Sequence, residues 1–185
     1  MKKTLKLILL VYTKFMTVYF TLLASIVGFE TVAMRISGIP YRTGNQIRYN
    51  FYKQHLKALG RNVTFNFGTL VTNKNTTIGD NVRFGPFNSI GYANIGSDIL
   101  TAQNVHILSG SNQHSYSTRE VPIIQQPGTI GCIELAGDNW IGASVVIMHN
   151  VGLGTIIGSG SIVTTPISDM VVAAGNPCKV LKSRP

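Results

Sequence analysis

A polar segment in the second half of the chain contains a residue suited to acid–base chemistry. Residues 109–116 read SGSNQHSY and include His114. An imidazole titrates near neutral pH, so His114 could take the proton from a substrate hydroxyl as a new bond forms. A lone histidine in a loop can equally be an incidental surface residue. His114 is therefore a candidate general base whose role depends on the elements that position it.

Metal chemistry is an alternative use of the same histidine. His106 and His149 lie close to His114 in sequence, and three histidines that converge from adjacent segments are typical of a zinc site. The two cysteines, Cys132 and Cys178, form neither a CxxC metal pattern nor a disulfide framework, so a reducing compartment is expected. A zinc-dependent hydratase thus remains an alternative at this point.

A short repeat, an apolar residue followed by glycine, flanks the polar segment. It occurs at Leu59-Gly60, Ile78-Gly79, Phe84-Gly85, Ile90-Gly91, Ile95-Gly96, Ile141-Gly142, Leu153-Gly154 and Ile157-Gly158. Neighbouring copies from Ile78 to Ile95 are five or six residues apart, which fits neither the helical period nor strand alternation. A unit this short cannot bury its own apolar residue, so copies must stack around one narrow core. The repeat predicts a parallel β-helix of triangular cross-section.

The repeat also predicts the domain organisation. We expect the β-helix over residues 59–167, a loop excursion over 109–133, and a C-terminal tail over 168–185. An excursion this long is usually functional or disordered. Nineteen glycines and a charged fraction of only 12% suit a stack of tight coils.

Two copies of the repeat read as too short. Leu153-Gly154 and Ile157-Gly158 are four residues apart, and Ala136 lies five residues before Ile141, where six are expected. A shortened copy should tighten a corner or lose a strand. Either change would reshape the neighbouring wall of the β-helix.

The N-terminus has a different character. Residues 5–29 read LKLILLVYTKFMTVYFTLLASIVGF, which is long and apolar enough to cross a bilayer. Lys2, Lys3 and Lys6 would lie on the cytoplasmic side. Lys14 would be costly at mid-membrane and fits better if the helix lies in the interface. We expect residues 1–30 to form a membrane-associated helix, although a helix that packs against neighbouring subunits is the alternative.

Residues 31–58 mix basic and aromatic side chains. They form a connector that could rest on anionic headgroups or cap the open first coil. The formal net charge of +9 indicates an acidic partner, such as a nucleic acid, an anionic membrane or a polyanionic cofactor.

Three segments resemble the hexapeptide-repeat acyltransferases, specifically the branch of galactoside, maltose, streptogramin and polysaccharide O-acetyltransferases. Residues 111–116 are similar to the family's Asn-His loop, although Gln113 separates the two residues here. Residues 138–147 (DNWIGASVVI) resemble the coil that follows the loop. The third runs from Ile157 to Val180 and is the most specific, because its Gly-Asn-Pro sequence does not fit one more repeat. The resemblance covers roughly residues 59–182.

The resemblance implies a left-handed parallel β-helix, with acetyl-CoA bound along the coils and its acetyl group moved to a hydroxyl. It makes His114 the catalytic base. The residues implied beside the acceptor are Asn112, Tyr116 and Trp140. The residues implied at the cofactor are Ala143, Ser159, Thr164, Lys179 and Lys182. The first three would line the thin pantetheine arm, and the lysines would meet the phosphates as point charges.

The resulting hypothesis is a homotrimeric O-acetyltransferase with a saccharide acceptor. The apolar N-terminus favours a lipid-linked or polymerising glycan, as in capsule or O-antigen assembly, at the cytoplasmic face of the cell membrane. The Asn-Gln-His loop and the Gly-Asn-Pro tail speak against zinc, so we expect no metal, and we expect no nucleic acid partner. The alternatives are a streptogramin-type or small-sugar acetyltransferase, and a structural solenoid without catalytic activity.

Overall fold

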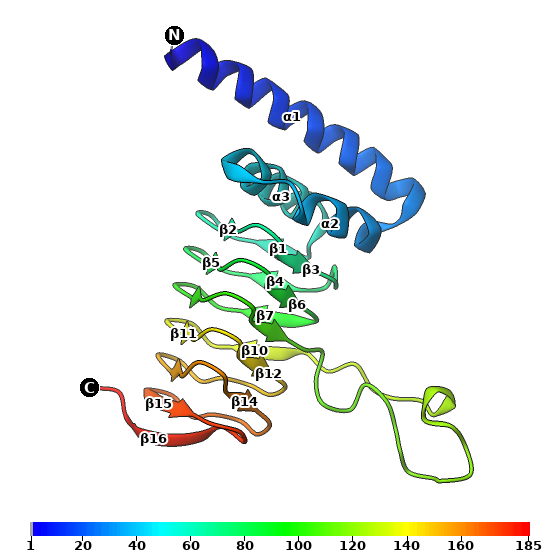
Figure 1. Cartoon of the computed structure of the whole chain (residues 1–185), viewed down its shortest axis with the longest axis vertical. Helices are drawn as coiled ribbons and strands as arrows, with labels where there is room; N and C mark the ends of the chain where they lie inside the picture. The colour runs from blue at the N-terminus through cyan, green and yellow to red at the C-terminus, as the bar shows by residue number, and fades with distance from the viewer. Residues whose placement is uncertain (1) are drawn as a thin grey trace.

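The protein consists of three helices followed by a β-solenoid of about six coils (Figure 1). The computed structural model describes residues 2–185, without the side chains of residues 2, 3, 5 and 6. The expectation that Lys2, Lys3 and Lys6 face the cytoplasm therefore lies outside the described residues. The predicted left-handed parallel β-helix with an N-terminal helical segment is confirmed.

Each of the first four coils contributes one short strand to each of three flat faces. Face A contains β1 (Ala58–Leu59), β4 (Thr77–Ile78), β7 (Ala93–Ile95) and β10 (Ile133–Leu135). Face B contains β2 (Thr64–Phe65), β5 (Arg83–Phe84), β8 (Leu100–Thr101), β11 (Trp140–Ile141), β13 (Ile156–Ile157), β15 (Val171–Ala174) and β16 (Lys179–Ser183). Face C contains β3 (Leu70–Val71), β6 (Ser89–Ile90), β9 (His106–Ile107), β12 (Val146–Ile147) and β14 (Ile162–Val163). Strands pair in parallel, except that β16 is antiparallel to β15.

The apolar residue of the repeat points into the solenoid. Phe65, Phe84 and Ile141 are fully buried on face B, whereas the residue before each of them points outward. The small residue that follows is required by the closeness of successive coils. At Gly85, for example, a Cβ atom would lie 2.2 Å from the carbonyl oxygen of Ala102. The repeat therefore has two structural causes: its apolar residue fills the core, and its small residue avoids a clash with the next coil.

The short step near residue 153 involves a different inward residue from the one that the repeat predicts. Leu153 is 48% exposed and lies at a corner, so Leu153-Gly154 is not an inward copy of the repeat. The inward residue of that coil on face A is Val151, four residues after Ile147. Since so few residues must also turn the corner, face A retains only single bridges at Val151 and Ile167 instead of strands.

The second expected irregularity is absent. Leu135, not Ala136, is the inward residue that precedes Ile141, and it is 1% exposed. The spacing is then the regular six residues. The step from face A to face B that precedes Trp140 is therefore regular in length.

The helices cover the open end of the first coil. They are α1 (Lys2–Val27), α2 (Phe29–Ser37) and α3 (Tyr41–His55). Tyr52 of α3 packs its ring 4.7 Å from that of Phe65, and its hydroxyl accepts a hydrogen bond from the Val71 N–H at 3.1 Å. Burial raises the pKa of Tyr52 well above its usual value. These contacts join α3 directly to the top of the solenoid.

Arg48 fixes the connection between the helices and the coils. Its buried guanidinium donates to the carbonyl oxygens of Ile36 (2.9 Å), Ser37 (3.0 Å), Ile39 (2.9 Å) and Phe65 (2.8 Å). Burial lowers the pKa of Arg48 to about 10, so the side chain stays charged at neutral pH. One cation thus satisfies carbonyl groups at the end of α2, in the α2–α3 turn and in the first coil.

Candidate active site

The long loop leaves the solenoid at the corner between faces C and A. It spans residues 108–132, between β9 and β10, and contains the short helix η1 (Ile123–Gln125) (Figure 1). Its two limbs are joined at the base, where the Thr129 N–H donates to the Asn112 carbonyl at 2.7 Å. At the tip, the Gln126 side chain is only 6% exposed and donates to the carbonyls of Thr118 and Val121. The loop therefore has its own folded structure.

His114 lies on this loop and is exposed. It lines a cavity of about 340 Å³, together with Asn112, Ser115, Tyr116, Ser117, Pro127, Gly128 and Thr129. The structure thus brings together the three loop residues that the sequence singled out, Asn112, His114 and Tyr116. An imidazole in an open cavity can reach a bound hydroxyl and exchange its proton with solvent.

Gly128 is a site residue that the sequence analysis missed. A Cβ atom at this position would lie 2.1 Å from the Gln113 carbonyl oxygen and 2.5 Å from the His114 nitrogen. The returning limb of the loop can therefore pass the His114 backbone only if it carries glycine there. The Pro127-Gly128 pair is a turn signal that could have indicated this position.

The other two histidines considered for a zinc site, His106 and His149, lie elsewhere. His106 points outward from face C, where its Nε2 is 3.3 Å from Asn104 Oδ1. His149 lies at the base of the loop and its Nδ1 accepts a hydrogen bond from the Asn150 N–H at 3.0 Å. Within residues 2–185, as far as their side chains are described, no three His, Cys, Asp or Glu residues are grouped so that they could hold a metal ion.

Trp140 belongs to an outward row on face B. It is 55% exposed and pairs in register with Leu100 on one side and Ile156 on the other. The row continues from Ile156 to Val172 and from Val172 to Lys182 on β16. The candidate aromatic residue and the candidate lysine are thus joined by a stripe of apolar side chains on one face.

Ala143 and Ser159 lie at the corner between faces B and C, beside this row. The Ala143 N–H donates to Ser159 Oγ at 3.1 Å, so the two residues are stacked on successive coils. Lys179 pairs with Ala174, whose Cβ would be 2.8 Å from a Cβ placed on Gly158. Lys179 is therefore near the same corner, on the next coil.

Thr164 is not part of this group. It follows β14 and therefore lies at the corner between faces C and A, on the side of the loop base. The cavity that contains His114 is likewise lined by loop residues alone. In one chain, Ala143 and Ser159 therefore lie at a different corner from the candidate base, and both corners border face C; Thr164 lies on the side of the base.

Comparisons with known proteins agree with this architecture. The chain is 38% identical over 127 residues to the galactoside O-acetyltransferase of Escherichia coli K12. This alignment covers 67% of this chain and 52% of that protein. The chain thus spans about half the length of this relative. It is 26% identical over 156 residues to WbbJ of the same strain, which is named for O-acetyl transfer in lipopolysaccharide biosynthesis; 80% of this chain and 78% of WbbJ are covered. No family model matches the chain.

A solved structure shows the same fold. It is a galactoside acetyltransferase in complex with coenzyme A, which superposes with a TM-score of 0.67 at 23% identity over 83% of this chain and 78% of that one. The hexapeptide repeat, the loop inserted at one corner and the sequence relatives lead to one assignment. The chain belongs to the hexapeptide-repeat acyltransferase family.

Proposed function

We propose that this protein is an O-acetyltransferase that moves an acetyl group from acetyl-CoA to a saccharide hydroxyl. The observation that carries the proposal is the outward row from Trp140 to Lys182, which adjoins the small residues Ala143 and Ser159. The names of the relatives, galactoside O-acetyltransferase among them, support the same chemistry.

The residues on face B fit coenzyme A. An exposed corner built from Ala143 and Ser159 leaves room for a thin chain against the backbone, and the apolar row offers cover for its non-polar parts. Lys182 ends the row and Lys179 lies near the corner, so both can approach phosphate groups as point charges. Acetyl-CoA supplies the acetyl group as a thioester when bound.

His114 is the proposed base. It would hold the acceptor hydroxyl through its imidazole and take its proton as the hydroxyl oxygen attacks the thioester carbonyl carbon, because a neutral hydroxyl is a poor nucleophile. As the carbon–sulfur bond breaks, the imidazolium would return the proton to the departing thiolate of CoA. Asn112 and Tyr116, which line the same cavity, orient the acceptor. Gly128 keeps the His114 backbone in place by allowing the two limbs of the loop to touch.

The complete site is proposed to form between subunits of a homotrimer. In one chain His114 lies on the loop at the corner between faces C and A, whereas the row that contains Trp140 lies on face B, so each is proposed to meet its counterpart on a neighbour. The loop also carries exposed apolar side chains, Ile123, Ile124 and Ile130, and Ile124 is 83% exposed. Such residues on a protruding loop are expected to pack against another chain.

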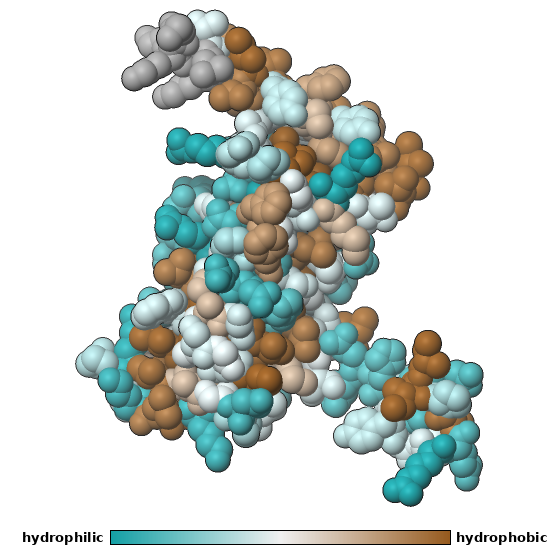
Figure 2. Space-filling view, in the orientation of Figure 1, coloured by the Kyte–Doolittle hydropathy of each residue, from teal (hydrophilic) through white to brown (hydrophobic). Residues whose placement is uncertain are grey.

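Membrane association through α1 is the second part of the proposal, and it would place the protein at the cytoplasmic face of the cell membrane. Leu7–Val27 is long and apolar enough to cross a bilayer. The exposed face of α1 nevertheless favours a helix that lies on the membrane, because Phe15 (69% exposed), Leu22 and Ile26 (80% exposed) all point away from the protein. Figure 2 shows hydrophobic surface along much of this helix.

The buried side of α1 is mixed in character: Phe20 packs into the core, and two threonines are buried with it. Thr13 and Thr17 are buried against the protein, and the Asn50 side chain of α3 donates to Thr17 Oγ1 at 3.4 Å. Helical residues are about 100° apart, so Lys14 lies at the flank of the face centred on Phe15 and can reach headgroups. A helix whose outward face is apolar along its length is suited to a lipid surface.

The enzymatic proposal is tested by release of free CoA from acetyl-CoA with and without mono- and oligosaccharide acceptors. Acceptor-dependent release with acetylated sugar as product is the expected result. Absence of release with every saccharide would leave a structural solenoid as the function.

Membrane association is tested by fractionation of cells that express the full chain. A protein that stays in the soluble fraction at low salt without detergent would make α1 a subunit contact.

A further inference from the structure

Two adjoining grooves lie beside α3, far from the loop. The first, between α1 and the start of α3, has a volume of about 220 Å³ and is lined by Leu9, Leu10, Thr13, Arg42, Thr43 and Gln46. The second, between α3 and the first coil, has a volume of about 430 Å³ and is lined by Arg42, Asn45, Gln46, Tyr49, Asn62, Val63 and Thr64. Arg42 and Gln46 line both, so the two grooves adjoin at these residues, and we call them together the α3 groove.

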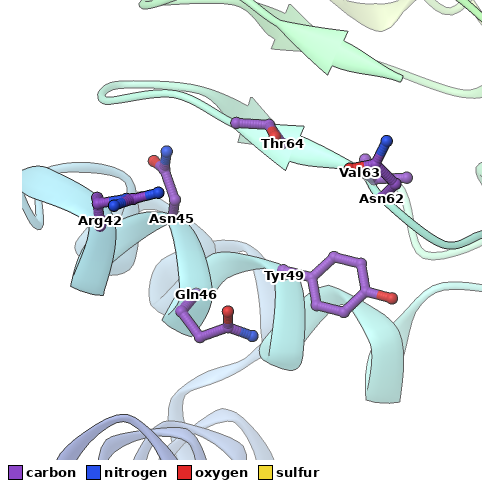
Figure 3. A pocket seen from close by; sticks show the side chains of 7 residues that line it. All are labelled: Arg42, Asn45, Gln46, Tyr49, Asn62, Val63 and Thr64. Carbon is purple, nitrogen blue, oxygen red and sulfur yellow. The ribbon is translucent and has the colours of Figure 1, made fainter. Parts of the chain in front are cut away.

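The chemistry of the α3 groove changes along its length. Leucine side chains of α1 form the end beneath the outward apolar face of that helix. Amide and hydroxyl side chains form the other end, where Figure 3 shows Asn45 and Tyr49 of α3 beneath the segment Asn62–Thr64. Arg42 lies between the two ends. An apolar slot, a cation and a polar slot in this order match an apolar chain, a phosphate and a saccharide.

Arg42 is available for such a phosphate. Its side chain is exposed, and neither of the two ion pairs among the described residues involves it. None of the described residues that line the two grooves is acidic. A guanidinium can bind a phosphate through two parallel hydrogen bonds, which an ammonium group cannot do. The groove is therefore complementary to an anionic headgroup rather than to a neutral sugar alone.

We infer that the α3 groove binds the lipid-phosphate end of the acceptor, which is a lipid-linked oligosaccharide. The lipid chain lies along Leu9 and Leu10, the phosphate meets Arg42, and the first sugar lies against Asn45 and Asn62. This inference rests on the proposed acetyl transfer and narrows its substrate class. The groove lies at the corner between faces A and B, because the segment from β1 to β2 lines it. In the shared-site trimer proposed above, both halves of the active site border face C, so the opposite corner points away from the threefold axis and neighbouring subunits leave the groove open.

The distance to the candidate active site requires an acceptor longer than one sugar. The groove adjoins β2 in the first coil, whereas Trp140 lies on β11, three strands further along face B. Adjacent strands are about 4.8 Å apart, so the two sites are separated by at least about 14 Å along the solenoid. The acetylated sugar would thus lie several units away from the lipid phosphate.

The test compares Arg42→Gln with Arg35→Gln in the full-length protein in detergent. Arg35 is also exposed and basic but lies on α2 and lines neither groove, so it controls for the loss of charge. The probes are a farnesyl-diphosphate-linked tetrasaccharide and the same tetrasaccharide without the lipid. We expect Arg42→Gln to raise the KM for the lipid-linked probe about tenfold or more, with KM for acetyl-CoA and turnover of the free tetrasaccharide unchanged. Arg35→Gln should resemble the wild type.

Three results would overturn the inference. One is equal behaviour of Arg42→Gln and Arg35→Gln with the lipid-linked probe. Another is an equal loss with the free tetrasaccharide, which would place the effect in the general fold. The third is weaker binding of Arg42→Gln to phosphatidylglycerol vesicles with unchanged KM, which would make bilayer phospholipid the occupant.

Binding of the lipid-linked probe without acetyl-CoA separates this inference from the proposed activity. Binding that depends on Arg42 in a protein that acetylates no saccharide would refute the acetyl transfer and leave the lipid-phosphate site standing. Acetylation of free saccharides without Arg42-dependent binding would support the acetyl transfer and refute the lipid-phosphate site.

Discussion

Mixing two inactive variants should restore activity if the active site is shared between subunits. His114→Ala removes the base at the corner between faces C and A. Ser159→Trp blocks the corner between faces B and C, where Ser159 is exposed and stacked on Ala143. Since these corners belong to different interfaces of one chain, a site that needs both must draw them from two neighbours. Each variant alone then lacks every complete site.

The expected recovery follows from threefold symmetry. In a closed ring of three subunits, every mixed trimer has one interface that combines an intact His114 with an intact Ser159. Random assembly from an equal mixture makes about three quarters of the trimers mixed, and each has about one third of the wild-type sites. The mixture should therefore show about one quarter of wild-type activity. The His114→Ala parent should retain about one hundredth or less.

The assay denatures both variants together, refolds them in detergent and measures acceptor-dependent CoA release. A mass tag on one variant allows native mass spectrometry to count mixed trimers. Ser159→Ala is the matched control, because it keeps the corner small and should retain activity in the unmixed enzyme. A mixture no more active than its parents, although mixed trimers are present, would place the whole site within one subunit and refute the shared-site reasoning.

The remaining predictions concern single residues. His114→Ala should lower turnover by about two to four orders of magnitude with CoA affinity nearly unchanged, and retention of more than about a tenth of the activity would exclude it as the base. His106→Ala should be far milder; a comparable loss, with metal found in the purified protein, would favour the zinc alternative. Gly128→Ala should lower turnover at least about tenfold while thermal unfolding of the solenoid is unchanged, because the new Cβ would displace the His114 backbone. Cys178 is buried and its pKa is raised by burial, so iodoacetamide at pH 8 should label Cys132 first and Cys178 only after unfolding, as peptide mass spectrometry would reveal.

The sequence was sufficient to predict the solenoid because the repeat is local. A five- to six-residue period requires an inward apolar residue and a small corner residue in every coil, and Phe84-Gly85 shows both requirements in the structure. The long break after Ile107 similarly indicated an insertion, because nothing in the period can absorb it. The grouping of the candidate loop residues Asn112, His114 and Tyr116 could also be predicted, because they are close together in the chain.

Residue spacing did not predict which residue faces the core where a corner of the solenoid changes length. Leu153-Gly154 matches the repeat in type but points outward, because the chain had already turned the corner at Val151. A pattern of residue types cannot distinguish an inward apolar residue from an exposed one at a turn. Only the pairing of Leu135, Val151 and Ile167 across successive coils fixes which residue faces the core.

The sequence by itself determined the fold, the insertion and the apolar character of α1, because each depends on residues close together in the chain. Tertiary structure alone decided which face of α1 is outward, that Trp140 and Lys182 share a row, and that Arg42 joins two grooves. These relations connect residues from separate coils and helices. Their geometry is set by how the coils stack and how α3 rests on the first of them, which no local pattern encodes.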